Sequence, residues 1–308
     1  MYHVFFIDAH FPWRISGAFS TMGSTLTILQ SLSTVLTFAC GFGGGLVAKI
    51  VQQGFVAKLL NLAAAGVLIA AGAVHLLPSG SGPLSSHVNG FPLGPVIAYA
   101  SLILLVAIHL LVEHKTAKKV VPKVKEREAL LNSSKESSIQ GGSIGSEEDD
   151  LARYLRRSSS LSSAIVLSIG LGFHSFLAGL GLGAQSTVTQ LLKIFGPILA
   201  HKSLAGLALG SSLVRAQVKT HIFYTVLTFF SLATPLGIVT GLVVSNFVDG
   251  DVWEATCICI AAGTFLYISL VDIMPQVLDA KMTLCKVASQ VLALTLGFGL
   301  MASLAIWI

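Results

Sequence analysis

Long apolar runs separated by short polar stretches fill most of the chain. A membrane-spanning helix needs about 20 predominantly apolar residues, and eight runs of roughly that length follow one another along the sequence. The pattern predicts an all-α, polytopic membrane protein with eight transmembrane helices. The predicted spans are residues 27–50, 55–77, 92–112, 162–185, 190–213, 221–245, 254–277 and 285–307.

One long polar stretch, residues 113–160, interrupts these runs and is rich in Ser, Gly, Lys and Glu. Because this composition cannot bury a core, we expect a largely disordered loop. The chain then divides into residues 1–112, an N-terminal segment with helices 1–3, the 113–160 loop, and residues 161–308 with helices 4–8. Residues 1–26 lack the basic start and long apolar region of a cleaved signal peptide, so we expect an exposed or interfacial segment.

Composition excludes a soluble fold. Of the 308 residues, 54% are hydrophobic and only 11% are charged, whereas soluble domains carry about 25% charged residues. The formal net charge of +5 does not indicate nucleic-acid binding, because the basic residues cluster at span ends and in the polar loop. We therefore expect the lipid bilayer as a partner and no nucleic acid. The four cysteines lack metal-binding spacing and are expected to be small core residues: Cys40, Cys257, Cys259 and Cys285.

The distribution of Lys and Arg predicts the orientation. Ten of them lie in residues 113–160, and cytoplasmic loops carry an excess of such residues. Placing this loop in the cytoplasm puts the pairs Lys49 and Lys58, Arg215 and Lys219, and Lys281 and Lys286 on the same side. Only Arg14 and Lys193 then fall outside, with Lys202 inside a span, and both termini are predicted to be outside.

Two histidines occur in matching frames on consecutive spans. The segments HSFLAGLGLG (174–183) and HKSLAGLALG (201–210) share the pattern H-x-x-L-A-G-L-x-L-G. At about 1.5 Å per residue, His174 and His201 lie near the middle of their helices, and ionisable residues at this depth are usually functional. Because imidazole binds zinc and other first-row divalent cations, the two residues are predicted to form one midplane metal site.

Several polar residues could complete this site. Ser175, Asp272 and His75 are the further candidate metal ligands, with Gln185, Ser212 and water as supplements. For Asp272 and His75 a structural role, such as a cap or an ion pair, is an open alternative. Lys202 is expected to pair with Asp272 or a backbone carbonyl and to point away from a metal. The glycines around the histidines indicate either tight helix packing or a permeation path.

Taken in order, these motifs resemble those of the ZIP (Zrt/Irt-like) metal transporters. The resemblance rests on His174-Ser175 with Gly179, on Ala200-His201-Lys202 with LALG, and on three further segments: GVLIAAGAVHLLP (66–78), SLATPLGIVTG (231–241) and GTFLYISLVDIMPQ (263–276). It implies a 3+2+3 bundle, in which a central helix pair is flanked by two inverted three-helix repeats. It also implies uptake of Zn²⁺, Fe²⁺ or Mn²⁺ into the cytoplasm through a midplane site.

The chain departs from the family at its acidic positions. The carboxylate that normally follows the fourth-span histidine by four residues is replaced by Ala178. The corresponding fifth-span position is Ala205, and the sixth-span position that carries glutamate in some members is Thr234. Alanine cannot ligate, so the site loses negative charge that would offset desolvation of a divalent ion. Weak binding, compensation by Asp272 and loss of transport all remain open.

Three function classes follow. The first is a divalent metal-ion transporter for zinc, iron or manganese, which is not an enzyme and carries its metal as substrate rather than as a cofactor. It would lie in the plasma membrane, with an internal membrane as the alternative, and could form a homodimer. The second is a non-transporting ZIP-like regulatory homologue. The third is an intramembrane zinc hydrolase, which would need three protein ligands and a general base.

Overall fold

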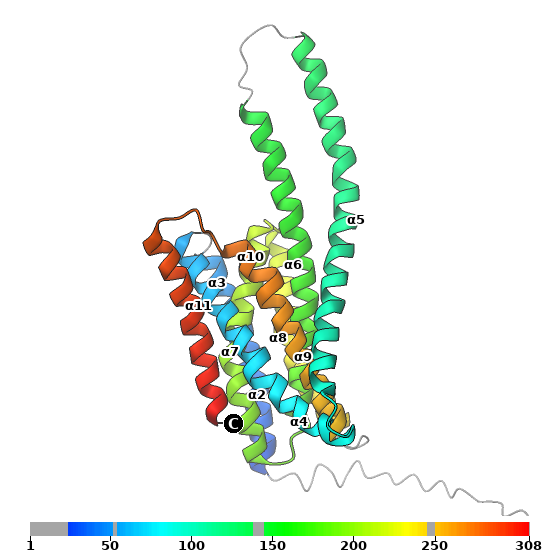
Figure 1. Cartoon of the computed structure of the whole chain (residues 1–308), viewed down its shortest axis with the longest axis vertical. Helices are drawn as coiled ribbons and strands as arrows, with labels where there is room; N and C mark the ends of the chain where they lie inside the picture. Colours follow the sequence, from blue (N-terminus) through cyan, green and yellow to red (C-terminus); the bar gives the residue numbers. More distant parts are fainter. Residues whose placement is uncertain (1–23, 52–53, 138–144, 245–249, 308) are drawn as a thin grey trace, which may run out of the picture.

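The computed structural model describes residues 24–51, 54–137, 145–244 and 250–307, and every regular element in them is helical (Figure 1). The predicted N-terminal segment, up to residue 23, lies outside the described residues. The elements are α2 (Ser24–Val51), α3 (Phe55–Ala70), the π-helical η1 (Ala71–Leu76), α4 (Leu77–His87), α5 (Leu93–Ser137), α6 (Gly145–Gly183), α7 (Val188–Arg215), α8 (Thr220–Val244), α9 (Gly250–Tyr267), the π-helical η2 (Ile268–Ile273), α10 (Met274–Val277), α11 (Leu284–Leu304) and the 3₁₀ turn η3 (Ala305–Trp307).

Within the described residues, eight helical segments are long and apolar enough to cross a membrane, as predicted. Continuous helix is expected there, because a helix satisfies its backbone hydrogen bonds internally and hydrocarbon offers no other partners. The second span runs from Phe55 to His87, ten residues beyond its predicted end, because η1 and α4 continue α3 through Pro78. The spans establish an integral, multi-pass membrane protein.

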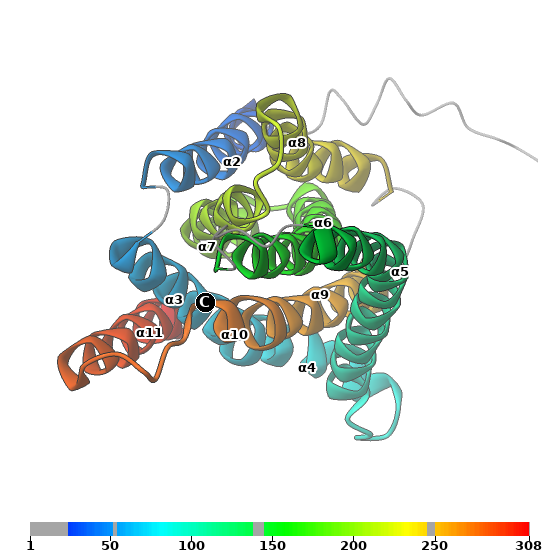
Figure 2. The same cartoon turned by 90° about the horizontal axis from the view of Figure 1, so that it is seen from above.

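The helices form three layers, which Figure 2 shows from above. The central pair α6 and α7 lies between α2 and α8 on one side and the helices α3, α9, α5 and α11 on the other. Packing is matched across the centre: α2 packs on α7 as α8 packs on α6, and α3 packs on α11 as α9 packs on α5. The π segments η1 and η2 also interrupt corresponding helices, which run in opposite directions. The structure thus has the predicted 3+2+3 arrangement with inverted repeats.

Glycines of the shared motif lie where the layers touch. A Cβ atom added to Gly206 would lie 2.2 Å from the carbonyl oxygen of Gly41 in α2, and one added to Gly179 would lie 2.2 Å from that of Thr234 in α8. Without side chains, both helix pairs approach backbone to backbone, as small residues allow in membranes. Close packing therefore accounts for these two glycines of the L-A-G pattern.

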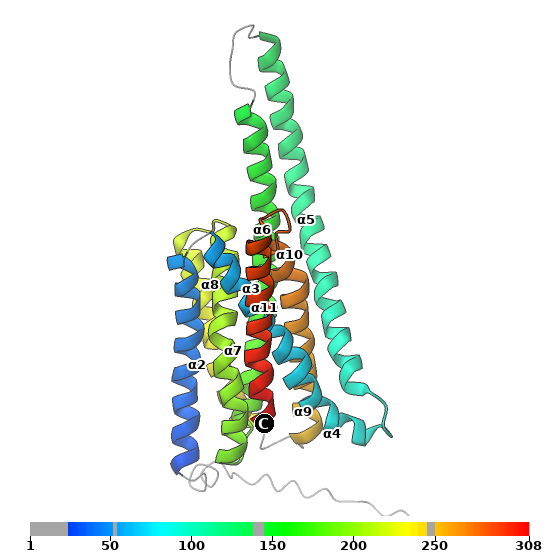
Figure 3. The same ribbon diagram turned by 60° about the vertical axis from the view of Figure 1, so that its left-hand side comes forward.

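Two ends of the bundle can be distinguished. Figures 1 and 3 show α5 and α6 projecting together beyond the other helices, and we call this the stalk end. The opposite end, where residues 184–187 join α6 to α7, is called the mouth end. The chain order of the described helices places the start of α2 and the end of α11 at the mouth end (Figure 3).

The described residues of the stalk are helical where the sequence predicts a largely disordered loop. Helix continues from the third span to Ser137 and resumes at Gly145, while residues 138–144 lie outside the described residues. Lys and Glu, the most frequent residues in 113–137, are strong helix formers. A helix that extends an existing span needs no new nucleus and no core of its own. The cytoplasmic position of the stalk and the division into domains stay predictions.

Candidate metal centre

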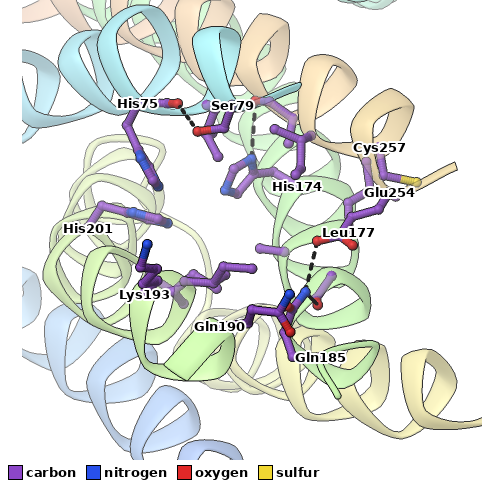
Figure 4. Close-up of a pocket in the computed structure, with 17 residues that line it drawn as sticks. His75, Ser79, His174, Leu177, Gln185, Gln190, Lys193, His201, Glu254 and Cys257 are labelled. Atoms are coloured by element: carbon purple, nitrogen blue, oxygen red, sulfur yellow. Dashed lines mark hydrogen bonds between the residues drawn. The ribbon is translucent and has the colours of Figure 1, made fainter. Parts of the chain in front are cut away.

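A cavity of about 270 Å³ opens among η1, α6, α7 and α9, toward the mouth end. Three of the five predicted ligands line it: His75 from η1, His174 from α6 and His201 from α7. Figure 4 shows their rings on one side of the cavity, while Glu254 and Gln185 lie on the other. The cavity thus brings imidazoles from three helical segments together inside the bundle.

His174 is held by α9 in a defined orientation. Its Nδ1 lies 3.2 Å from the carbonyl oxygen of Ala261 and 3.3 Å from Oγ1 of Thr264. A carbonyl oxygen only accepts, so the contact assigns the ring proton to Nδ1 and leaves the lone pair on Nε2. That Nε2 atom is buried and has no hydrogen-bond partner within the described part of the chain. The neutral ring is therefore prepared for ligation, as in metal sites where the second nitrogen is fixed by hydrogen bonding.

His201 faces His174 across a short gap. The two ring centroids are 5.7 Å apart, with an angle of 70° between the ring planes. The buried ring of Phe265 stacks on His174 at 3.5 Å between centroids and meets His201 edge-on at 4.9 Å. Aromatic neighbours in these geometries restrict ring rotation, so Phe265 orients both imidazoles.

His75 reaches the cavity from a π-helical segment, a type of helical distortion that often occurs at functional sites. Its side chain is buried, with 8% of its surface exposed. Within the residues described, no three His, Cys, Asp or Glu side chains are grouped closely enough to hold a metal ion together. Structural and catalytic zinc sites use three or four protein ligands. The arrangement therefore suits an ion that shares its ligands with water more than one held permanently.

Ser175 and Asp272, the other two predicted ligands, do not line the cavity. The Oγ atom of Ser175 accepts a hydrogen bond of 2.9 Å from Lys202 Nζ, on the side of α6 that faces α8. Asp272 belongs to η2, near the stalk end, where its Oδ1 accepts a hydrogen bond of 3.2 Å from Gln276. The sequence placed both inside the apolar runs, but it did not reveal which way they face.

Lys202 is buried and points away from the cavity, as expected. Its ammonium donates to Ser175 Oγ and Thr234 Oγ1, both at 2.9 Å, and to the carbonyl oxygen of Phe230 at 3.3 Å. It also lies 3.9 Å from the centroid of the Phe230 ring. Of the two predicted partners, the backbone carbonyl is confirmed. Lys202 thus joins α6, α7 and α8 and takes up the polar groups of Ser175 and Thr234.

Two cavity residues of metal-ligating types, a glutamate and a cysteine, were not predicted as part of the site. Glu254 begins the seventh predicted span, and Cys257 was expected to be a small core residue. Cys257 is buried, as expected, and both side chains line the cavity. With Ala261 they have the spacing i, i+3, i+7, which places side chains on one helix face; that spacing was the available signal. The two substituted acidic positions also differ, because Ala178 lines the cavity whereas Ala205 is buried in the main core.

Comparisons with known proteins give the same family as the fold. The family model described as "ZIP Zinc transporter" matches residues 26–305. The chain belongs to the ZIP zinc transporter family. It is 32% identical over 272 residues to "Zinc transporter 5" of Oryza sativa subsp. japonica, covering 79% of this chain and 75% of the relative.

Other relatives are similarly named. The chain is 29% identical to "Zinc transporter 3" of Arabidopsis thaliana, covering 79% of this chain and 72% of the relative. It is 35% identical to "Zinc transporter ZIP1" of Danio rerio over 46% of each chain. Metal-ion transport, with zinc as the favoured ion, is therefore the function that its family supports.

Proposed function

We propose that this ZIP protein carries divalent metal ions, zinc first among them, across the membrane into the cytoplasm through the cavity lined by His174 and His201. The observation that carries the proposal is the Nε2 atom of His174. It is buried, unpartnered within the described residues and adjacent to a second imidazole in the middle of the bundle. A buried nitrogen lone pair without a donor is costly unless a ligand satisfies it.

The three histidines suggest how an ion would be held. His174 and His201 would each supply a neutral imidazole nitrogen, whereas His75 would meet the ion earlier, on its way in from the mouth side. Water would complete the coordination, since the described residues contain no closed group of three ligands. Such weak coordination favours transport, because an ion must leave its site as readily as it reaches it.

The direction rests on two observations. The cavity is lined toward the mouth end by Gln185, Gln190 and Lys193, which flank the α6–α7 turn. The distribution of basic residues predicts that the stalk end is cytoplasmic. An ion entering at the mouth would therefore come from outside the cytoplasm. Release toward the stalk would require the central pair α6 and α7 to move relative to their neighbours, as in other transporters built from inverted repeats.

Zinc is the favoured ion because imidazole and thiol ligands suit it and because the relatives named above are called zinc transporters. Iron and manganese are the alternatives, since affinity order alone does not separate such ions in a site of nitrogen and water.

Two other functions compete with transport. A non-transporting regulatory role is favoured by Ala178, which lines the cavity where the family carries a carboxylate. A zinc hydrolase would need three ligands and a base around an open position. His75 supplies a third imidazole in the cavity, but the three rings do not form a metal-holding group in the described part of the chain. We therefore propose a transporter that is not an enzyme.

The test is radioactive zinc uptake into cells that express the protein at the surface. We expect wild-type uptake above background and its loss in the His174→Ala/His201→Ala variant. The matched control is His87→Ala/His221→Ala, which removes two exposed histidines outside the cavity and should leave uptake unchanged. Competition with iron and manganese then ranks the ions.

No uptake by surface-expressed wild type would favour the regulatory role. If Ala178→Glu then created uptake, loss of the cavity carboxylate would be the reason. Uptake that survives loss of both histidines would place the ion path elsewhere.

A further inference from the structure

The cavity contains a carboxylate that comes from outside the two histidine motifs. Glu254 lines it from the second turn of α9, and Lys193 lines it from α7. These are the carboxylate and the ammonium among the described lining residues, alongside neutral histidines. A single positive charge in a low-dielectric opening would repel a divalent cation, and a carboxylate in the same opening offsets that repulsion.

Glu254 lies on α9, nearer the mouth end than the imidazoles and across the cavity from them (Figure 4). It precedes Ala261, whose carbonyl holds His174, by seven residues, which corresponds to roughly 10 Å along α9. Cys257 lines the cavity between these two levels. An ion arriving from the mouth would therefore meet Glu254 one to two helical turns before it reaches His174.

The carboxylate is positioned by its neighbours. Gln185 Nε2 donates to Glu254 Oε1 at 2.9 Å and to the carbonyl oxygen of Gly181 at 2.9 Å, and 8% of Gln185 is exposed. Gly181 has no side chain, and a Cβ atom there would lie 3.9 Å from Glu254 Oε1. The carboxylate thus rests against α6, with its orientation fixed by a buried amide.

This location corresponds closely to that of the missing acidic residue. Ala178 and Gly181 both line the cavity, and residues three apart on a helix share a face. Glu254 Oε1 therefore presents its charge to the same face of α6, one turn nearer the mouth than a carboxylate at position 178. The negative charge comes from α9 instead of α6.

We propose that Glu254 is the capture residue of this cavity: a carboxylate at its mouth that binds the incoming divalent cation and substitutes for the acidic residue absent at position 178. The inference rests on the proposed transport function. It predicts that Glu254 governs apparent affinity, whereas His174 and His201 are needed for any translocation.

The experiment measures zinc uptake against zinc concentration. We expect Glu254→Gln, which keeps a group able to bond Gln185, to raise the apparent KM about tenfold, the size expected when one nearby charge is lost, and to leave the maximal rate nearly unchanged. A raised KM with an unchanged maximal rate is expected of a group that stabilises the bound ion equally in the ground state and in the transition state of the rate-limiting step. Glu254→Asp should retain most of the affinity.

Two further variants separate capture from structural support. In the Glu254→Gln/Ala178→Glu variant, restoring a carboxylate on the facing helix should return the apparent KM toward that of wild type. Asp279→Asn removes a carboxylate that bonds Lys58 at the stalk end and should not change the KM. A purely structural role of Glu254 would instead lower surface expression or the maximal rate, and Ala178→Glu would not correct it.

Zinc binding to the purified protein provides a second readout. Equilibrium dialysis should show about tenfold weaker binding in Glu254→Gln than in wild type. Equal affinities, or an unchanged KM in a protein whose uptake depends on His174 and His201, would overturn the capture role and leave the proposed function standing. Absent uptake by wild type would refute transport, and the binding comparison would still decide the role of Glu254.

Discussion

In the first repeat the π segment η1 turns His75 toward the cavity, whereas in the second repeat η2 places Asp272 in a buried cluster near the stalk end. The two segments occupy corresponding places, and each is followed by proline, in the sequences HLLP (75–78) and DIMP (272–275). The mouth end thus presents the polar side chain of this segment to an open cavity, whereas at the stalk end the corresponding segment has its polar side chain packed against protein.

The cluster around Asp272 is buried but incompletely paired. Asp272 is 1% exposed and its Oδ2 atom has no hydrogen-bond partner within the described residues. Arg215 acts on it electrostatically, yet its Nε and Nη2 atoms are also buried and unpartnered there. Buried charges are stable only with compensation. The two repeats therefore differ in the surroundings of these residues: His75 lines a cavity that opens toward the mouth end, whereas Asp272 is buried in protein near the stalk end.

The largest expected effect comes from removing the compensating charge. Arg215→Ala should lower the free energy of unfolding by about 3 kcal/mol, because it removes a positive charge that stabilises the buried carboxylate of Asp272. Unfolding in mixed micelles measures this effect. Adding Asp272→Asn should restore most of the loss, and Lys219→Ala, which removes an exposed cation at the same end, should have little effect. If Arg215→Ala is as stable as wild type, the cluster is not a charge-compensated one.

The two repeats are alike in the packing of the central helices, and this likeness can also be tested. Gly206→Ala and Gly179→Ala should each destabilise the protein by roughly 2 kcal/mol, because the added methyl group would overlap a backbone carbonyl of the adjacent helix. Gly172→Ala is the matched control. No atom lies within 4 Å of its added Cβ, and alanine is the better helix former. Unfolding experiments should find equal losses for the first two variants and none for the third.

The membrane spans and the two central histidines could be predicted from the sequence for physical reasons. Hydropathy locates spans because hydrocarbon admits continuous helix, and His174 and His201 stood out because ionisable residues are rare at that depth. The frame that they share also marks the glycines that face α8 and α2, Gly179 and Gly206. One motif therefore marks both a packing surface and a candidate site.

The facing of individual side chains could not be read in the same way. A π segment adds a residue to a helical turn, so every later position rotates by about 100° relative to an uninterrupted α-helix. For this reason the direction of Asp272 within its span was not predictable. Ser175 faces α8, where Lys202 donates a hydrogen bond to it, and Glu254 reaches the cavity from a different helix than the motif suggests. These are contacts between helices, and residue spacing along one helix does not predict them.

The smallest effect is also the most direct test of the difference between the two ends. In a background lacking the four native cysteines, Ala178→Cys should react with a small, charged thiol reagent about tenfold faster than Ser163→Cys, a difference of ~1.4 kcal/mol in accessibility. Ala178 lines the open cavity, whereas Ser163 is buried and accepts a hydrogen bond from Gln276 beside Asp272.

Zinc should slow the reaction at position 178, because an ion held by the histidines occupies the cavity, and should leave position 163 unchanged. Equal rates at both positions would mean that both ends are open, or both closed, and the contrast between the two repeats would then be one of sequence alone.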